Sequence, residues 1–434
     1  MRDSLGNHCT LKGGTGFPEA LQGEREGELP FIKVSDMSLP GNERFITGAN
    51  NYISGATAGH LGATVFPPQT IVFAKVGAAL LLNRRRILTV PTVIDNNMMG
   101  ATSTNANPLF LYHFLSSIDF GDFVQTGALP SVNQRILSAI QFPGFSGTEQ
   151  KRIAEILSTV DEAIEQTEAL IAKTQQIKAG LMHDLFTRGV TADGKLRPPR
   201  EEAPNLYKES PLGWIPKEWA FPKVGECISG IDAGKSPECP DIPSANDQWG
   251  VLKVGAVHPD GLRQNENKVV LNPALYNVEY LLRDGDLLIS RANTVDLVGL
   301  VCQVREAPPN LMLSDKTLRL RVSHGVADAR YLFWVLQFHT TRLQIESFAT
   351  GTSGSMKNIS QVSVKALVVP LPGIQEQERI AERLDSLLQV SFCLKQELGK
   401  MNQLRNGLMH DLLTGRVPVT VAGAAEAEEA AADV

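Results

Sequence analysis

The strongest constraint in this 434-residue chain is an internal repeat. Residues 149–190 align with residues 376–417 at a constant offset of 227 positions and without a gap, and 17 of the 42 aligned residues are identical. The first copy begins EQKRIAE where the second begins EQERIAE, and both contain the run GLMHDL near their ends. Self-similarity at a fixed spacing indicates repeated structure. We therefore expect the chain to fold as two similar halves.

Both copies of the repeat have the pattern of long amphipathic helices. Apolar residues recur at steps of three and four, neither copy contains proline, and Ser146 with Glu149 forms a capping-box signature ahead of the first copy. The apolar stripe is narrow and close to a heptad, which favours an intramolecular coiled coil acting as a spacer, with a partner-binding helix as the alternative. The residues expected to pack in the seam are Ile153, Leu157, Val160, Ile164, Ile171, Leu181, Ile380, Leu384, Leu387, Leu394, Leu398 and Leu408.

The segments that precede the two helices correspond more loosely. Thr70–Lys75 parallels Asp286–Arg291, each an apolar strand that ends on a cation, and residues 109–117 parallel residues 331–338 as an aromatic-rich helix. Each half is therefore expected to be a mixed globule, of fold class α/β (α+β), that leads into a long helix. The expected parts are a first globule at 1–145, a first helix at 146–190, a proline-rich linker at 191–214, a second globule at 215–372, a second helix at 373–417 and an acidic, Ala-rich, disordered tail at 418–434.

The composition excludes several classes of protein. No stretch approaches the roughly 18 unbroken apolar residues of a membrane span, and the first residues lack the order of a signal peptide, so we expect a cytoplasmic protein. The five cysteines are widely spaced without a Cys-x-x-Cys pair, which argues against a disulfide framework or a thiolate metal site. The formal net charge of −6 argues only weakly against a nucleic-acid partner, because four of the acidic residues lie in the tail.

Two motifs resemble catalytic sites but fit other structures better. Residues 230–236 resemble a phosphate-binding loop, but the motif is one residue short and prolines follow where a helix would have to begin. Asp260, Glu266 and Lys268 resemble the set that holds Mg²⁺ in nucleases, but Asp260-Gly261 is a strong hairpin-turn signal. We therefore predict a chain without catalytic or metal-binding residues.

The remaining signal is for binding through loops. Cations and amides are concentrated on expected loops and strand ends, and Arg, Lys and Asn are the side chains that read guanine and adenine edges in the DNA major groove. Any one of these charges taken singly is more often an ordinary solvated side chain. The candidate DNA-binding residues are Lys33, Lys75, Arg84, Arg85, Lys235, Ser236, Lys253, Arg291, Asn293, Lys316, Ser355, Lys357 and Asn358.

The order of globule, helix, linker, globule and helix resembles the specificity subunit of type I DNA restriction-modification enzymes. Three motifs carry the resemblance. Residues 370–381 are similar to the start of that family's central helix, residues 207–219 to the start of its second target-recognition domain, and residues 407–415 to the end of its helix. Together they make the resemblance span nearly the whole chain.

The resemblance implies a subunit without chemistry of its own. Each globule would be a target-recognition domain that reads one half of a split DNA site, and the two helices would pack antiparallel and fix the separation of the half-sites. The expected partners are double-stranded DNA, two methyltransferase subunits and restriction/translocase subunits of a phage-defence system. S-adenosylmethionine, Mg²⁺ and ATP would be bound by those subunits and no cofactor by this chain. Two alternatives stay open: a fused, type II-like restriction-methylation protein, and a coiled-coil scaffold without DNA contact.

Overall fold

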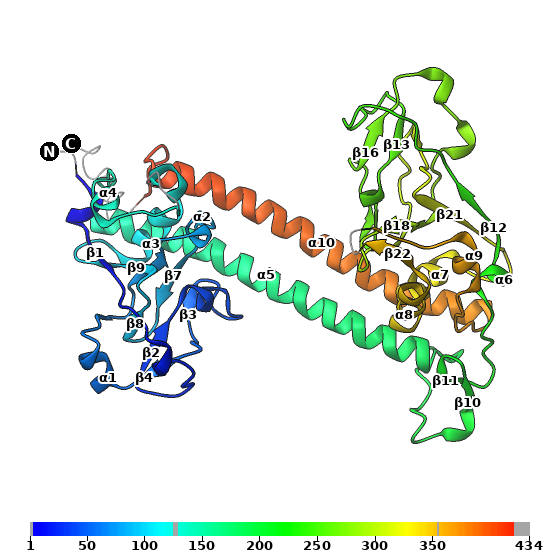
Figure 1. Ribbon diagram of the computed structural model, residues 1–434, viewed down its shortest axis with the longest axis horizontal. Helices are drawn as coiled ribbons and strands as arrows, with labels where there is room; N and C mark the ends of the chain where they lie inside the picture. Colours follow the sequence, from blue (N-terminus) through cyan, green and yellow to red (C-terminus); the bar gives the residue numbers. More distant parts are fainter. Residues whose placement is uncertain (1–2, 125–128, 354–355, 421–434) are drawn as a thin grey trace, which may run out of the picture. The chain divides into compact units, whose positions relative to one another are not determined.

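The computed structural model describes residues 3–124, 129–353 and 356–420, and Figure 1 shows it as a ribbon. The chain forms two compact units, the first built on residues up to Glu168 and from Glu397 onward, the second on Ala169–Gln396. Both units combine β-sheets with helices, so the expected fold class is confirmed. Disorder is expected for the tail at 418–434. Residues 421–434 of this tail lie outside the described part of the chain.

The first unit is built around a five-stranded sheet in the order β1-β9-β6-β7-β3, with a four-stranded sheet in the order β4-β2-β8-β5. Phe73 of the first sheet and Phe110 of helix α3 share the largest apolar core of the unit. The strands are β1 (Cys9–Gly13), β2 (Leu29–Ile32), β3 (Phe45–Ile46), β4 (Tyr52–Ile53), β5 (Val65–Phe66), β6 (Ile71–Ala74), β7 (Arg85–Leu88), β8 (Thr92–Ile94) and β9 (Met98–Ser103). The short helices are α1 (Gly55–His60), α2 (Ala78–Leu81), α3 (Pro108–Ser116) and α4 (Gln134–Ser138).

The second unit repeats this plan with a four-stranded sheet in the order β12-β21-β17-β19. Leu318 and Leu320 of this sheet pack with Trp334 of helix α7 in the core. The strands are β10 (Tyr207–Ser210), β11 (Gly213–Pro216), β12 (Ile228–Ala233), β13 (Gly250–Leu252), β14 (Val257–His258), β15 (Gly261–Leu262), β16 (Asn267–Val269), β17 (Leu287–Ser290), β18 (Ala292–Asn293), β19 (Val301–Gln303), β20 (Leu311–Met312), β21 (Thr317–Val322), β22 (Thr350–Ser353) and β23 (Met356–Asn358). The short helices are α6 (Val224–Cys227), α7 (Ala329–Val335), α8 (His339–Phe348) and α9 (Gln361–Ala366).

Each unit also holds part of both long helices, which are α5 (Gly147–Thr187) and α10 (Ile374–Leu413). In the first unit Ile153, near the start of α5, shares a core with Met409, near the end of α10. In the second unit Leu185, near the end of α5, shares a core with Ile380, near the start of α10. Within each unit the two helices therefore run antiparallel. None of the helices in the described part of the chain combines the length and the apolar composition that a membrane crossing requires.

The proline-rich segment expected as a linker at 191–214 is folded and belongs to the second unit. β10 and β11 pair as an antiparallel hairpin, with Tyr207 opposite Pro216. The Tyr207 hydroxyl donates a hydrogen bond to the carbonyl of Pro198 at 2.6 Å. The prolines restrict the backbone of this segment. Contacts with distant residues, which cannot be read from the local sequence, hold it in one conformation.

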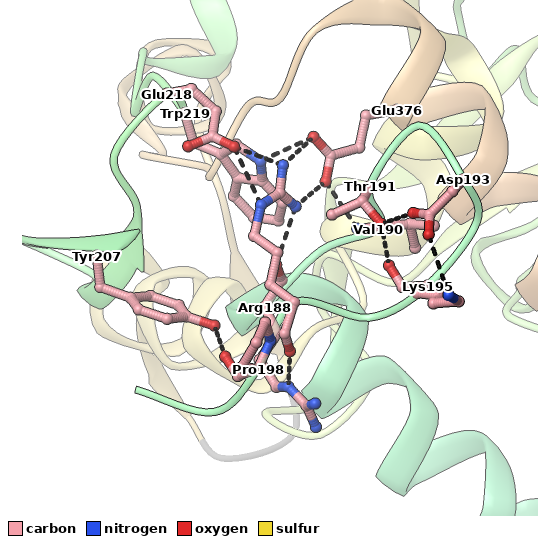
Figure 2. Close-up of polar contacts among 11 residues, drawn as sticks. Arg188, Val190, Thr191, Asp193, Lys195, Pro198, Tyr207, Glu218, Trp219 and Glu376 are labelled. Carbon is pink, nitrogen blue, oxygen red and sulfur yellow. Dashed lines mark hydrogen bonds and ion pairs between the residues drawn. The ribbon is translucent and has the colours of Figure 1, made fainter. Parts of the chain in front are cut away.

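Glu376, at the start of α10, fastens this segment to the unit (Figure 2). Its carboxylate accepts hydrogen bonds from the Arg197 guanidinium, from the Trp219 indole N–H at 3.1 Å and from the Val190 backbone N–H at 2.7 Å. Arg197 and Glu376 are each only 7 % exposed, and Arg197 also pairs with Glu218 at 2.6 Å. Burial lowers the pKa of Arg197, but the bond to Glu376 more than compensates, so that its pKa is raised. The buried Arg197 guanidinium therefore stays charged.

Candidate nucleic-acid interface

The second unit gathers predicted DNA-binding residues at one end of its sheet. β12 and β17 both run antiparallel to β21, so they end where β21 begins. Lys235 follows β12, Arg291 follows β17, and Lys316 precedes β21. The Arg291 backbone N–H donates to the Lys316 carbonyl at 2.8 Å, which joins two of these loops directly. Three cations that lie far apart in the sequence thus come together.

The hairpin formed by β22 and β23 extends the same end of the sheet. Asn293 pairs with Lys357 across β18 and β23, and the backbone N–H of Ile359 donates to the Arg291 carbonyl at 2.9 Å. The Lys357 ammonium donates to the Gly351 carbonyl at 2.7 Å. We call the resulting set the second reading edge; it consists of Lys235, Ser236, Arg291, Asn293, Lys316, Lys357 and Asn358.

Asp315 organises the side chains at the centre of this edge. The Lys316 ammonium donates to its carboxylate at 2.8 Å, the Ser236 hydroxyl also donates to it, and the Arg291 guanidinium donates to its backbone carbonyl at 3.5 Å. Burial raises the pKa of Asp315, but the contacts with Lys316 and Ser236 lower it by more. Its pKa is therefore below its ordinary value, and the carboxylate stays ionised. Asp315 therefore holds the Lys316 ammonium with its carboxylate and the Arg291 guanidinium with its backbone carbonyl, and the edge keeps a net positive charge.

Two other residues that were predicted to bind DNA, Lys253 and Ser355, are not part of the second reading edge. Lys253 follows β13, but its ammonium is paired with Asp241 at 2.5 Å, and this hydrogen bond raises the pKa of Lys253. A cation already neutralised by a carboxylate contributes little to phosphate binding. Ser355 lies outside the described residues.

In the first unit, Lys75 occupies the place that Arg291 has in the second. It follows β6, which corresponds to β17, and its backbone N–H donates to the Asn97 carbonyl at 2.9 Å. Arg84 precedes β7 and lies at the same end of the sheet, because β7 is antiparallel to β6 with Arg85 opposite Phe73. Arg84 is exposed and donates to the Ser38 hydroxyl. Two predicted cations thus mark the matching edge of the first unit.

Lys33 lies beside this edge, on the smaller sheet of the first unit. It follows β2, whose parallel pairing with β8 places Ile32 opposite Ile94. Its ammonium donates to the Gln22 side chain at 3.0 Å, a neutral partner that leaves the charge in place. Lys33 therefore remains available for a phosphate contact.

Arg85 is a correction, because its guanidinium faces the interior rather than DNA. The residue is 2 % exposed, lies over the Phe120 ring at 3.7 Å and donates to the Ile118 carbonyl at 2.8 Å. Burial lowers its pKa to about 10. Successive side chains of a strand point to opposite faces, so that adjacent arginines cannot all face solvent. Arg85 supports the fold of the first unit and takes no part in the interface.

The residues predicted for the helix seam are all buried or half-buried. Asp161 on α5 and Arg405 on α10 pair at 2.5 Å beside this seam in the first unit. The buried members of the seam are Ile153, Leu157, Ile164, Ile380 and Leu384. The half-buried members are Val160, Ile171, Leu181, Leu387, Leu394, Leu398 and Leu408. The burial of the stripe therefore varies along both helices.

The motifs that resemble catalytic sites have structural roles. β12 continues to Ala233, and the loop after Gly234 leads into no helix that could cradle a phosphate. Asp260 lies in the tight turn between β14 and β15 and pairs with Lys395 at 2.5 Å. Among the described residues, no group of three or more His, Cys, Asp or Glu side chains is arranged to hold a metal ion.

The comparisons with known proteins agree on one family. The family model described as "Type I restriction modification DNA specificity domain" matches residues 4–176 and 228–404. The chain is 32 % identical to the type I restriction enzyme EcoEI specificity subunit of Escherichia coli, over 57 % of this chain and 40 % of that protein. It is 24 % identical to the type I restriction enzyme MjaVIII specificity subunit of Methanocaldococcus jannaschii, over 67 % of this chain and 65 % of that protein.

These alignments cover less than two thirds of either relative's length. The fold is shared with the crystal structure of the type I restriction-modification system S subunit from M. genitalium, which matches with a TM-score of 0.59 at 15 % identity and covers 94 % of both chains. Because the family model matches most of each half, the chain belongs to the family of type I restriction-modification DNA specificity proteins.

Proposed function

We propose that this chain is the DNA-recognition subunit of a type I restriction-modification enzyme and that each unit reads one half of a bipartite target. The observation that carries the proposal is that the same end of the sheet bears a cation in both units. Lys75 follows β6 in the first unit, and Arg291 follows the equivalent strand β17 in the second. The chain binds no cofactor in this proposal. Methyl transfer from S-adenosylmethionine and DNA cleavage with Mg²⁺ and ATP belong to methyltransferase and restriction/translocase subunits.

The chemistry of the edges supports DNA as the ligand. Arg and Lys bind guanine O6 and N7 and also phosphate oxygens, whereas Asn pairs with adenine N6 and N7. The second reading edge offers Lys235, Arg291 and Lys357, together with a lysine paired with Asp315, two amide side chains and one hydroxyl, from loops that converge on one sheet end. Such a set can combine phosphate contacts, which position the protein, with base contacts, which select the sequence.

The long helices support a fixed distance between the two half-sites. α5 has 41 residues, which at 1.5 Å per residue corresponds to roughly 60 Å of helix. A helix pair of this length resists bending far better than a flexible linker. We infer that helix length, rather than the globules, sets the number of base pairs between the half-sites.

Exposed apolar side chains on the helices support protein partners. Leu170 and Ile177 on α5, and Val390 and Phe392 on α10, are each about half exposed. Exposed apolar surface on a helix can be covered by a protein partner. We infer that the methyltransferase subunits cover part of this helix surface.

The test is a map of methylated adenines in DNA from cells that express this chain with and without a type I methyltransferase subunit. We expect one bipartite motif when both proteins are present and no methylation from this chain alone. Methylation or cleavage by the purified chain, with S-adenosylmethionine or Mg²⁺ added, would instead indicate a fused enzyme. DNA binding that is weak and insensitive to salt, without any motif, would indicate a scaffold.

The same map tests the role of the helices. Removal of one heptad from α5 and one from the facing part of α10 shortens the pair by about 10 Å, or roughly three base pairs of DNA. We expect the spacer of the motif to shorten by about that number while the bases of both half-sites stay the same. An unchanged spacer in a stably folded variant would exclude the helices as the determinant of spacing.

A further inference from the structure

The sheet ends that carry Lys75 and Arg291 correspond in their strand pairing. Ala74 of β6 pairs with Met98 of β9, and Ser290 of β17 pairs with Thr317 of β21, at the same end of each sheet. The residues just before Met98 and Thr317 therefore take equivalent places. The equivalent pairs are Asn97 and Lys316, and Asn96 and Asp315.

A pair of glycines confirms this equivalence independently of strand pairing. A Cβ atom on Gly14, after β1, would lie 2.3 Å from the Ile94 carbonyl oxygen, and one on Gly234, after β12, would lie 1.8 Å from that of Leu313. Only glycine permits so close an approach of two backbone segments. The segment after the first strand of each sheet thus packs against the equivalent turn. Gly14 lies beside the turn that carries Asn96 and Asn97, and Gly234 lies beside the turn of Asp315 and Lys316.

The turn of the first unit is held rigidly while its amides stay free. Asp95 is 7 % exposed, and its carboxylate accepts a hydrogen bond from the Asn97 backbone N–H at 2.6 Å. The Met98 backbone N–H donates to the Asp95 carbonyl at 2.9 Å. Asn96 and Asn97 are both exposed, and their side-chain amides form no hydrogen bond with other residues in the described part of the chain. A preorganised turn with free amides is suited to recognition of a planar, hydrogen-bonding partner.

We propose that Asn96 and Asn97 read base edges in the half-site bound by the first unit and that they favour adenine. The proposal rests on the DNA-recognition function argued above. A side-chain amide donates and accepts at once, which matches N7 and N6 of adenine. At the same place the second unit presents Lys316 fixed by Asp315. The two half-sites are therefore read with different chemistry from equivalent positions.

The experiment replaces each asparagine in the complex with a methyltransferase subunit and maps the methylated motif. We expect Asn96→Ala or Asn97→Ala to relax base preference at one or two positions of one half-site, with discrimination reduced roughly 5- to 150-fold. The other half-site should stay the same. Asn97→Asp keeps the shape of the side chain but loses its donor, and it should shift the preference from adenine toward cytosine, whose N4 group donates to a carboxylate.

Two control variants separate base reading from general weakening. Asn105→Ala removes an exposed amide beyond the other end of β9 and should leave the motif unchanged. Lys75→Ala should lower the salt dependence of binding by about one unit of slope without changing the motif, whereas the asparagine variants should leave the slope unchanged.

The outcomes distinguish this inference from the function on which it rests. If the unmodified complex methylates no bipartite motif, the proposed function fails. If it methylates one and all three asparagine variants retain the full motif, the function stands and this assignment is overturned. Relaxation of both half-sites together would also overturn it, because a local base contact affects one half-site only.

Discussion

Replacing Glu376 by alanine is expected to lower the free energy of unfolding of the second unit by about 3 kcal/mol or more. The substitution leaves the Arg197 guanidinium buried with Glu218 as its one carboxylate partner among the described residues, and it deprives the Trp219 indole and the Val190 backbone N–H of their acceptor. Loss of one member of a buried ion pair is costly because the remaining charge stays desolvated. Urea denaturation measures the effect.

The repeat supplies a matched control for this substitution. Glu149 occupies the equivalent position in the first copy, but it is only half-buried and caps its own helix through the Ser146 backbone N–H at 2.8 Å. Glu149→Ala should cost about 1 kcal/mol or less. All four tryptophans lie in the second unit, at positions 214, 219, 249 and 334, so that their fluorescence follows this unit. An equal loss of unfolding free energy in the two variants would show that the contacts of Glu376 add no stability beyond that of a helix cap.

Removing three cations from the second reading edge is expected to weaken DNA binding on the order of 100-fold near physiological salt. The variant carries Lys235→Ala, Arg291→Ala and Lys357→Ala. Each phosphate contact contributes about 0.9 to the slope of log affinity against log salt concentration, so the slope should fall by about 2.7. Fluorescence anisotropy of labelled target DNA, titrated with the assembled complex at several salt concentrations, measures both quantities.

Lys253→Ala is the control for this experiment. The Lys253 ammonium is paired with Asp241 at 2.5 Å, so its removal should change the slope little. An unchanged slope in the triple variant would contradict the placement of DNA on this edge. So would an equally large effect of Lys253→Ala.

The two halves and their long helices could be predicted from the sequence because their signal is local. The repeat and the spacing of apolar residues such as Ile153 and Ile380 depend only on helix period. The strand that ends on Lys75 or Arg291 is likewise visible as an apolar run followed by a cation. These elements position the reading edges, so that most of the second edge was predictable.

Other features depend on contacts between distant residues and could not be predicted. The run Arg84–Arg86 shows three cations, but only the strand register turns Arg85 inward against Phe120. Asn96 and Asn97 carry no charge, and only sheet pairing equates them with Asp315 and Lys316. Glu149 and Glu376 begin the similar runs EQKRIAE and EQERIAE, yet only Glu376 pairs with Arg197 from the preceding segment.

If each unit reads one half-site independently, exchange of the first globule should alter one half-site alone. Residues 1–145 are replaced by the corresponding globule of another specificity protein of this family, and the methylated motif is mapped in the presence of the methyltransferase subunit. We expect one half-site to change while the other half-site and the spacer stay the same. A change in both half-sites would contradict independent reading.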